Sequence, residues 1–243
     1  MKAPKQPKDF FIQQIAELIQ KNGYTRILDL GSGTSLNFIP LLEQFPDLTY
    51  VGVELNKPEA EKGRKNLAQF KNVRIYNQPG YELEKEKAGF DLCLSLSVLE
   101  HVKQLEKFLQ LSIALVKSGG EIIHRYDLGH ALYPCSPKEH LQVWLGNNFP
   151  KLLPENKFVC YLSEEKVKTI LEKNGAKVIQ TTYHQMPNLK AFLKYFFSED
   201  AEAQKLREQI LQWEYSVSPH LQSLPQATRE KLFPTICIWA KKL

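Results

Sequence analysis

Apolar residues recur along this chain with two alternating periods, one of helical spacing and one of strand length. Residues 10–19 have the helical spacing. Asp9 precedes them as an N-cap, and Asn22-Gly23 follows them as a stop signal. A first helix is therefore expected at about 9–22. Short apolar runs then alternate with amphipathic stretches, which predicts a mostly parallel sheet with helices on both faces. The pattern predicts strands at about 25–30, 48–54, 73–77, 90–96, 121–126, 176–183 and 235–240, and further helices from 35 and at about 57–70, 99–116 and 163–174.

Two stretches, at about 127–162 and 187–230, interrupt this alternation. Ligands of open α/β sheets bind outside the carboxyl ends of the strands, and the first stretch follows such an end. We therefore expect both stretches to form a substrate cap on a single domain, 1–243, whose binding core is about 24–126. The alternatives are a satellite hydrophobic core and, for the aromatic start of the second stretch, a partner surface. The aromatic residues at that start are Phe192, Tyr195, Phe196 and Phe197.

The composition is that of a globular protein, with 43% hydrophobic and 24% charged residues. No apolar run approaches the roughly 20 residues that span a membrane. The Lys- and Pro-rich start has no apolar signal-peptide segment, so a cytoplasmic location is expected. The four cysteines form no Cys-x-x-Cys pair, which argues against a cysteine zinc site. The net charge of +5 comes from lysines spread over helix faces, so nucleic acid is a less favoured partner than a small molecule or sugar.

A glycine loop follows the first predicted strand. In the segment Asp-Leu-Gly-Ser-Gly at 29–33, two glycines let the backbone approach a ligand closely. About twenty residues later the second strand ends in Glu54, a carboxylate that can accept two hydrogen bonds from a ribose diol. The combination is typical of a nucleotide site. A dinucleotide site is the alternative, but its third glycine is replaced here by Leu36.

Three segments together resemble class I S-adenosyl-L-methionine (SAM)-dependent methyltransferases of the type 11/12 kind. They are the loop at 29–33, the segment Phe-Asp-Leu-Cys-Leu-Ser-Leu-Ser-Val-Leu-Glu-His-Val at 90–102 and the Ser-Gly-Gly turn at 118–120. The resemblance covers about 26–126. It implies a Rossmann-like, doubly wound, seven-stranded α/β fold, with SAM as cofactor and S-adenosyl-L-homocysteine (SAH) as product. The glycine loop would hold the methionine end of SAM, and the end of the second strand would hold its ribose. Residues at the ends of the second to fourth strands would hold the rest of the molecule. The implied cofactor residues are Asp29, Gly31, Ser32, Gly33, Glu54, Leu55, Asn77, Gln78, Ser95 and Leu96.

Some members with this Leu-Glu-His segment bind a divalent metal through an additional acidic residue three positions before the glutamate. That position is Ser97 here, and Glu100 with His101 supplies too few ligands for a hard cation. We therefore expect no metal. The alternative for Glu100 is a structural role, as a first-turn carboxylate favoured by the helix dipole.

Histidines near the carboxyl edge of the sheet are the candidates for a general base, because imidazole titrates near neutral pH. His130 lies a few residues beyond the fifth strand and is favoured, with Asp127 to orient its ring, whereas His101 opens a helix and could face SAM. A loop or capping role is the alternative for His130. The stretch at 124–130 is also weakly similar to bacterial glycan-associated methyltransferases, which implies a sugar hydroxyl as acceptor. The expected catalytic residues are thus His130, Asp127 and His101.

Three functions are compatible with these features. The favoured one is SAM-dependent transfer of a methyl group to a small molecule or sugar, at a hydroxyl oxygen. An RNA methyltransferase is less favoured, because residues 95–98 lack the Asn/Asp-Pro-Pro-aromatic turn of many amino-directed nucleic-acid methyltransferases. A non-catalytic SAM-binding protein is less favoured because the loop and Glu54 are intact. No motif in the sequence identifies the acceptor or the oligomeric state.

Overall fold

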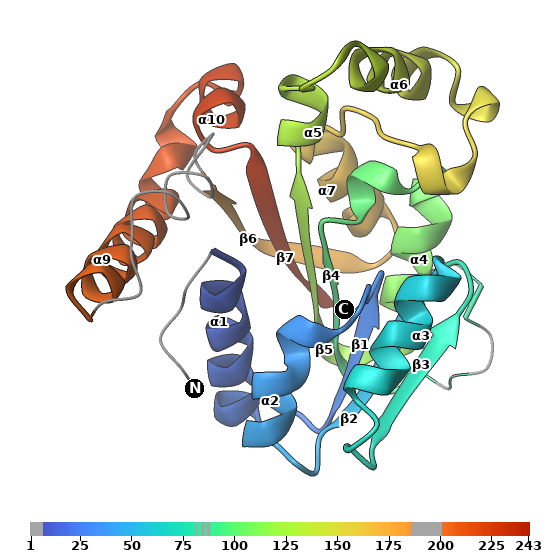
Figure 1. Cartoon of the computed structure of the whole chain (residues 1–243), viewed down its shortest axis with the longest axis vertical. Helices are drawn as coiled ribbons and strands as arrows, with labels where there is room; N and C mark the ends of the chain where they lie inside the picture. Colours follow the sequence, from blue (N-terminus) through green and yellow to red (C-terminus); the bar gives the residue numbers. More distant parts are fainter. Residues whose placement is uncertain (1–6, 81, 84–85, 87, 186–200) are drawn as a thin grey trace.

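The computed structural model describes residues 7–80, 82–83, 86, 88–185 and 201–243. Its strands form a seven-stranded sheet in the order β3-β2-β1-β4-β5-β7-β6 (Figure 1). This arrangement confirms the predicted seven-stranded α/β fold. The strands are β1 (Arg26–Leu30), β2 (Thr49–Glu54), β3 (Val73–Asn77), β4 (Phe90–Leu96), β5 (Val116–Asp127), β6 (Ala176–His184) and β7 (Thr235–Lys242).

The pairings from β3 through β5 are parallel, and β7 is antiparallel to both β5 and β6. The reversal follows from where β7 begins. Thr235 pairs with His184, the last residue of β6, so the connection between the two strands returns to the same edge of the sheet. A strand that starts at the carboxyl edge has to run back toward the amino edge. The sheet is therefore mostly parallel, as predicted.

Helices cover both faces of the sheet, because alternate strand side chains enter two separate hydrophobic clusters. Leu28 and Cys93 belong to one cluster with α4 and α7, and Ile27 and Leu92 belong to the other with α1, α2 and α3. Figure 1 shows α1 and α2 side by side. The helical elements of these layers are α1 (Pro7–Asn22), η1 (Leu36–Phe38), α2 (Ile39–Gln44), α3 (Lys57–Asn66), η2 (Leu99–His101), α4 (Leu105–Leu115) and α7 (Glu164–Lys173).

The long helix predicted at 99–116 is wrong in extent, because it breaks into the single 3₁₀ turn η2 and the helix α4. The first insertion occupies the backbone at the break. The carbonyl of Glu100 accepts a 3.0 Å hydrogen bond from the Cys160 amide, and the amide of Lys103 donates to Glu155 at 3.1 Å. These groups are then engaged by the insertion rather than by a continuous helix. The next strand also starts earlier than predicted, at Val116.

The first insertion folds into short helices above the carboxyl ends of β4 and β5 (Figure 1). Ser136 caps α6 by accepting a hydrogen bond from the Glu139 amide at 3.3 Å. Gly146 brings α6 against the following extended segment, since a Cβ there would lie 1.8 Å from the carbonyl oxygen of Val159. The elements are α5 (Gly129–Leu132), α6 (Pro137–Asn148), η3 (Pro150–Leu152) and η4 (Glu155–Lys157).

The described part of the second insertion is helical and comprises α9 (Ala201–Val217), η5 (Ser218–Ser223) and α10 (Gln226–Leu232). The aromatic residues predicted to open this insertion, at 192–197, lie outside the described residues. None of the described helices is long and apolar enough to cross a lipid bilayer.

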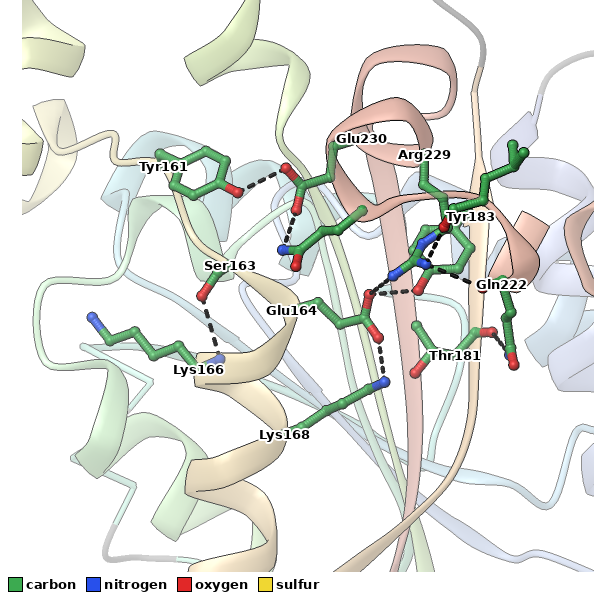
Figure 2. Close-up of polar contacts among 12 residues, drawn as sticks. Tyr161, Ser163, Glu164, Lys166, Lys168, Thr181, Tyr183, Gln222, Arg229 and Glu230 are labelled. Carbon is green, nitrogen blue, oxygen red and sulfur yellow. Dashed lines mark hydrogen bonds and ion pairs between the residues drawn. The ribbon is translucent and has the colours of Figure 1, made fainter.

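A polar network joins α7, β6 and α10 (Figure 2). Glu164 at the start of α7 is buried and accepts a hydrogen bond from the Tyr183 hydroxyl of β6. The same carboxylate pairs with Lys168 of α7 and lies 3.5 Å from the Arg229 guanidinium of α10. Nearby, Tyr161 donates to Glu230 at 2.7 Å. The helical second insertion is thereby fixed to the far edge of the sheet.

Candidate functional site

A cavity of about 480 Å³ lies at the carboxyl ends of β1, β2 and β4. Its wall contains the glycine loop, the end of β2 and the segments that follow β3 and β4, and Glu155 and Asn156 of the first insertion also line it. Most of the residues predicted to hold a cofactor therefore converge here. The predicted residues that line the cavity are Asp29, Gly31, Ser32, Gly33, Glu54, Leu55 and Leu96.

The glycine loop has a conformation that its sequence requires. Gly31 has φ +84°, and a Cβ on it would lie 2.3 Å from Cγ2 of Val98 in the segment after β4. Gly33 has φ +53° with open space where its Cβ would point. The amides of Gly31 and Ser32 both donate to the carbonyl of Val53, at 2.7 and 3.0 Å. The loop is thus pinned to β2 and leaves its glycine backbone accessible from the cavity.

Asp29 is the last residue but one of β1 and lies beneath this loop. The carboxyl group is 2% exposed and accepts a 2.7 Å hydrogen bond from the Tyr50 hydroxyl at Oδ2. Its Oδ1 is buried and has no hydrogen-bond partner among the described residues. Burial raises the pKa of Asp29 to about 7. The site therefore contains an acceptor that a ligand N–H group or cation would satisfy.

Glu54 at the end of β2 organises the same wall of the cavity. Its Oε2 accepts from the Gly33 amide at 2.8 Å and its Oε1 accepts from the Asn56 amide at 2.7 Å. A carboxylate offers about four acceptor positions, so both oxygens can take a further hydrogen bond. Leu55 is 39% exposed and offers an apolar surface beside this carboxylate.

Three of the predicted cofactor residues point elsewhere. The Asn77 amide donates to the carbonyls of Glu54 and Leu55 at 2.9 Å, and the Gln78 amide donates to the carbonyl of Glu82 at 2.7 Å. Ser95 is fully buried and bonds Nδ1 of His124 at 2.8 Å. None of the three is among the described residues that line the cavity.

Other residues, which were not predicted from the sequence, take these places in the wall. Gly80 packs so closely on Phe108 of α4 that a Cβ would lie 2.6 Å from its ring. Ser97 adopts a left-handed φ of 57° directly after β4. The proline and glycine after Asn77-Gln78 were an available signal, whereas the contributions of α4 and η4 depend on folding. The missed lining residues include Pro79, Gly80, Ser97, Val98, Phe108 and Asn156.

The predicted catalytic histidines do meet, and they meet around Glu100. The rings of His101 and His130 have centroids 5.4 Å apart. Oε1 of Glu100 lies 3.9 Å from Nε2 of His101 and 3.8 Å from Nδ1 of His130. Burial raises the pKa of Glu100 to about 8 and lowers the pKa of His101. The cluster therefore brings together a buried carboxyl group and two imidazoles.

Asp127 does not lie where it was expected to orient His130. Its Oδ1 accepts from the Gly129 amide at 2.7 Å, and its Oδ2 accepts from the Gln185 side chain at 3.4 Å. Its own amide donates to Glu100 at 3.2 Å. Asp127 thus shapes the turn into α5, and Glu100 is the carboxylate beside the His130 ring. The turn places Nδ1 of His130 3.8 Å from Oε1 of Glu100.

A second cavity of about 290 Å³ lies under α5 and α6. His130 lines it together with Tyr133, Glu139 and Gln142, and Val143 and Val159 supply apolar surface. His101 lines the first cavity. The two imidazoles therefore stand between the cavities, one facing each.

The chain matches a family model described as "Methyltransferase domain" over residues 4–181. Among curated proteins it is similar to the ubiquinone biosynthesis O-methyltransferase of Pelagibacter ubique (strain HTCC1062), with 26% identity over 113 residues, 46% of this chain and 45% of that protein. The aligned region spans less than half the length of the curated relatives that it matches.

Two solved structures have a similar fold. The geranyl diphosphate C-methyltransferase of Streptomyces coelicolor A3(2), whose structure contains SAH, has a TM-score of 0.58 with 12% identity, covering 95% of this chain and 77% of that one. The O-methyltransferase of a trans-AT PKS multienzyme of Brevibacillus brevis, also solved with SAH, has a TM-score of 0.55 with 14% identity, covering 94% and 71%.

Proposed function

Because the chain belongs to the methyltransferase-domain family, whose members use SAM, we propose that it transfers the methyl group of SAM to a hydroxyl oxygen of a small molecule or sugar. The observation that carries this proposal is the position of His101 and His130 between the two cavities. The first is lined by most of the predicted cofactor residues, and the second lies under α5 and α6. The O-methyltransferases among the similar proteins favour oxygen as the methylated atom.

The described residues of the first cavity fit SAM. Its amino group would satisfy the buried Oδ1 of Asp29, and its methionine end would lie against the open backbone of Gly33. Glu54 retains acceptor positions for the ribose hydroxyls. Leu55 and Gly80 would enclose the adenine, and Asn77 contributes by holding the carbonyl of Leu55 in place.

The second cavity fits a polar acceptor. The side chains of Tyr133, Glu139 and Gln142 each make one hydrogen bond within the chain, to Lys231, Cys135 and Lys157. The Tyr133 and Glu139 oxygens keep acceptor positions, and the Gln142 amide keeps a second N–H, for sugar or phenol hydroxyls. The apolar surface of Val143 and Val159 would take the carbon skeleton. A pocket of mixed character with a few polar groups is typical of small-molecule sites.

The arrangement can also remove the hydroxyl proton. SAM, when bound, supplies an electrophilic methyl group on a positively charged sulfur. The carbonyl of Phe158 can only accept, so Nδ1 of His101 carries the proton of their 2.9 Å hydrogen bond and Nε2 keeps a lone pair. With SAM bound, an imidazole of His130 or His101 would take the proton that the acceptor hydroxyl gives up when its oxygen receives the methyl group, and SAH would be the other product. Such general-base assistance contributes typically about 10²–10⁴-fold.

The first experiment is titration calorimetry of SAM and SAH with the wild-type chain, Glu54→Ala and Glu61→Ala. We expect wild type to bind both ligands with micromolar affinity. The affinity should fall at least tenfold in Glu54→Ala, because the contacts of Glu54 with the glycine loop and with the ribose are both lost, and it should not change in Glu61→Ala. Glu61 is the matched control, since its side chain lies 53% exposed on α3. Failure of the folded wild-type chain to bind either ligand would sink the proposal. Acceptors, sugars and phenols first, are then screened for a methyl-group mass gain.

A further inference from the structure

Three side chains that commonly bind metals converge between the two cavities. Glu100 and His101 belong to η2 and His130 to α5, and the candidate ligand atoms all lie within 4.8 Å of one another. Oε1 of Glu100 is 3.9 Å from His101 Nε2 and 3.8 Å from His130 Nδ1. A tetrahedral zinc ion with ligands at ~2.0–2.1 Å keeps them roughly 3.3 Å apart, so each of the two Glu100–histidine distances has to shorten by about 0.5 Å.

The His101 ring is already held as a metal ligand is held. Its Nδ1 donates to the carbonyl of Phe158 at 2.9 Å, and the nitrogen with the free lone pair, Nε2, faces Glu100. A metal-binding histidine almost always gives its other ring N–H to a carbonyl or carboxylate, which fixes the tautomer and the ring orientation. The cap segment that carries Phe158 therefore supplies the outer support of such a site.

Glu100 provides a second observation that points to a ligand. Its side chain is 0% exposed. Oε1 accepts a 3.2 Å hydrogen bond from the Asp127 amide, and Oε2 finds no hydrogen-bond partner within the described parts of the chain. A buried carboxylate with an unsatisfied oxygen is costly unless a cation or donor completes it.

We propose that Glu100, His101 and His130 bind one divalent first-row transition-metal ion, with zinc as the representative. Two imidazoles and one carboxylate form the ligand set of catalytic zinc and non-haem iron sites, which leave coordination positions open. Magnesium and calcium prefer oxygen-only sites and fit less well. No metal was expected because the segment after β4 offers only Glu100 and His101. The fold adds His130 from a different segment.

The ion would face both cavities, since His101 lines the first and His130 the second. A hydroxyl bound at an open position loses its proton more readily, as metal-bound water does. The ion would then replace His130 in activating the acceptor hydroxyl, with the proton released to solvent. This consequence depends on the proposed methyl transfer, whereas the metal site itself does not.

The test is a titration of the chelator-treated full chain with Co²⁺, followed by visible absorption and then by displacement with Zn²⁺. We expect one equivalent of Co²⁺ to produce ligand-field bands, and affinity to fall at least tenfold in His130→Ala. His140→Ala, an exposed histidine of α6 in the same cap, should bind as wild type does. Because His130 is 52% exposed, its replacement should leave the fold intact.

A second variant tests direct coordination. His130→Cys should restore Co²⁺ binding and add an intense thiolate-to-cobalt absorption band, which a merely structural role of His130 would not produce. The proposal is overturned if wild type shows no ligand-field bands at saturating Co²⁺, if His130→Ala binds as tightly as wild type, or if the cysteine variant lacks that band. SAM binding by the metal-free chain is measured separately, so failure of this site and failure of the methyltransferase proposal are distinguishable.

Discussion

The Tyr50 hydroxyl donates a 2.7 Å hydrogen bond to Oδ2 of Asp29 beneath the glycine loop, so the end of β1 is held by a side chain of β2. Both residues are almost completely buried. Burial raises the pKa of Asp29 to about 7, against the lowering effect of the Tyr50 hydrogen bond. The first cavity is thus built on a carboxyl group that is partly neutral at physiological pH until a ligand reaches it.

Replacing Asp29 by asparagine should flatten the pH dependence of stability. The folded pKa of about 7 lies above the ordinary value of 3.8, so between these values the native state binds more protons than the unfolded state. The free energy of unfolding of wild type therefore falls as pH rises from about 4 to 7, by at most ~1.4 kcal/mol per pH unit from this group. Urea denaturation at pH 5, 6 and 7 measures the slope.

Asp47→Asn is the control for that experiment, because Asp47 is exposed. It should keep the wild-type slope. A wild-type slope in Asp29→Asn as well would show that Asp29 is not the group responsible. SAM affinity should fall in Asp29→Asn, since the amide cannot offer the cofactor's amino group a charged acceptor.

Gly31→Ala should impair both stability and SAM binding. The new Cβ would lie 2.3 Å from Val98, and the residue would keep a φ of +84°, so the segment after β4 has to move. Gly23→Ala is matched in backbone strain, with φ +65°, but its Cβ meets no atom within 4 Å. We expect the left-handed backbone to destabilise both variants by about 1–2 kcal/mol. Gly31→Ala should lose further stability, and its affinity for SAM, measured by calorimetry, should be weaker. Equal behaviour of the two variants would contradict the close approach.

Gly146→Ala should reverse the usual effect of this substitution. In the interior of a helix, alanine is normally favoured over glycine by about 1 kcal/mol. Here the added Cβ would lie 1.8 Å from the Val159 carbonyl oxygen, so α6 has to separate from the segment below it. We expect a lower Tm and unchanged SAM binding, because the first cavity lies outside this contact. A higher Tm would show that α6 does not pack as described.

Glu164→Gln should weaken the attachment of the second insertion. The neutral side chain leaves the Arg229 guanidinium, whose side chain is 16% exposed, without its 3.5 Å ion pair. Removing one partner of a largely buried ion pair typically costs about 3 kcal/mol. Chemical denaturation measures the loss, and Glu165→Gln on the exposed side of the same helix should cost less than 0.5 kcal/mol, roughly the limit for surface substitutions. A similar loss in both would assign the effect to the helix and not to the network.

Local pattern determined much of the candidate cofactor site. The limits of β3 and β4 agree with those predicted, and for β4 the reason is that a buried strand ends where its apolar residues end. Gly31 follows β1 and Glu54 is the last residue of β2, and parallel strands bring their carboxyl ends together at one edge. The same logic failed at Asn77 and Gln78, because the direction of a side chain beyond a strand depends on its partners.

The sequence by itself determined the order of strands and helices, the glycine loop and the acidic end of β2, because each is expressed in residues close together along the chain. Only the tertiary structure decided that β7 reverses, that η4 reaches the first cavity, and that His130 lies beside Glu100. The last pair is 30 positions apart, and its meeting depends on the turn at Asp127 and on the cap folding back over η2. Such contacts arise from the packing of whole elements, and local periodicity along the chain does not reveal them.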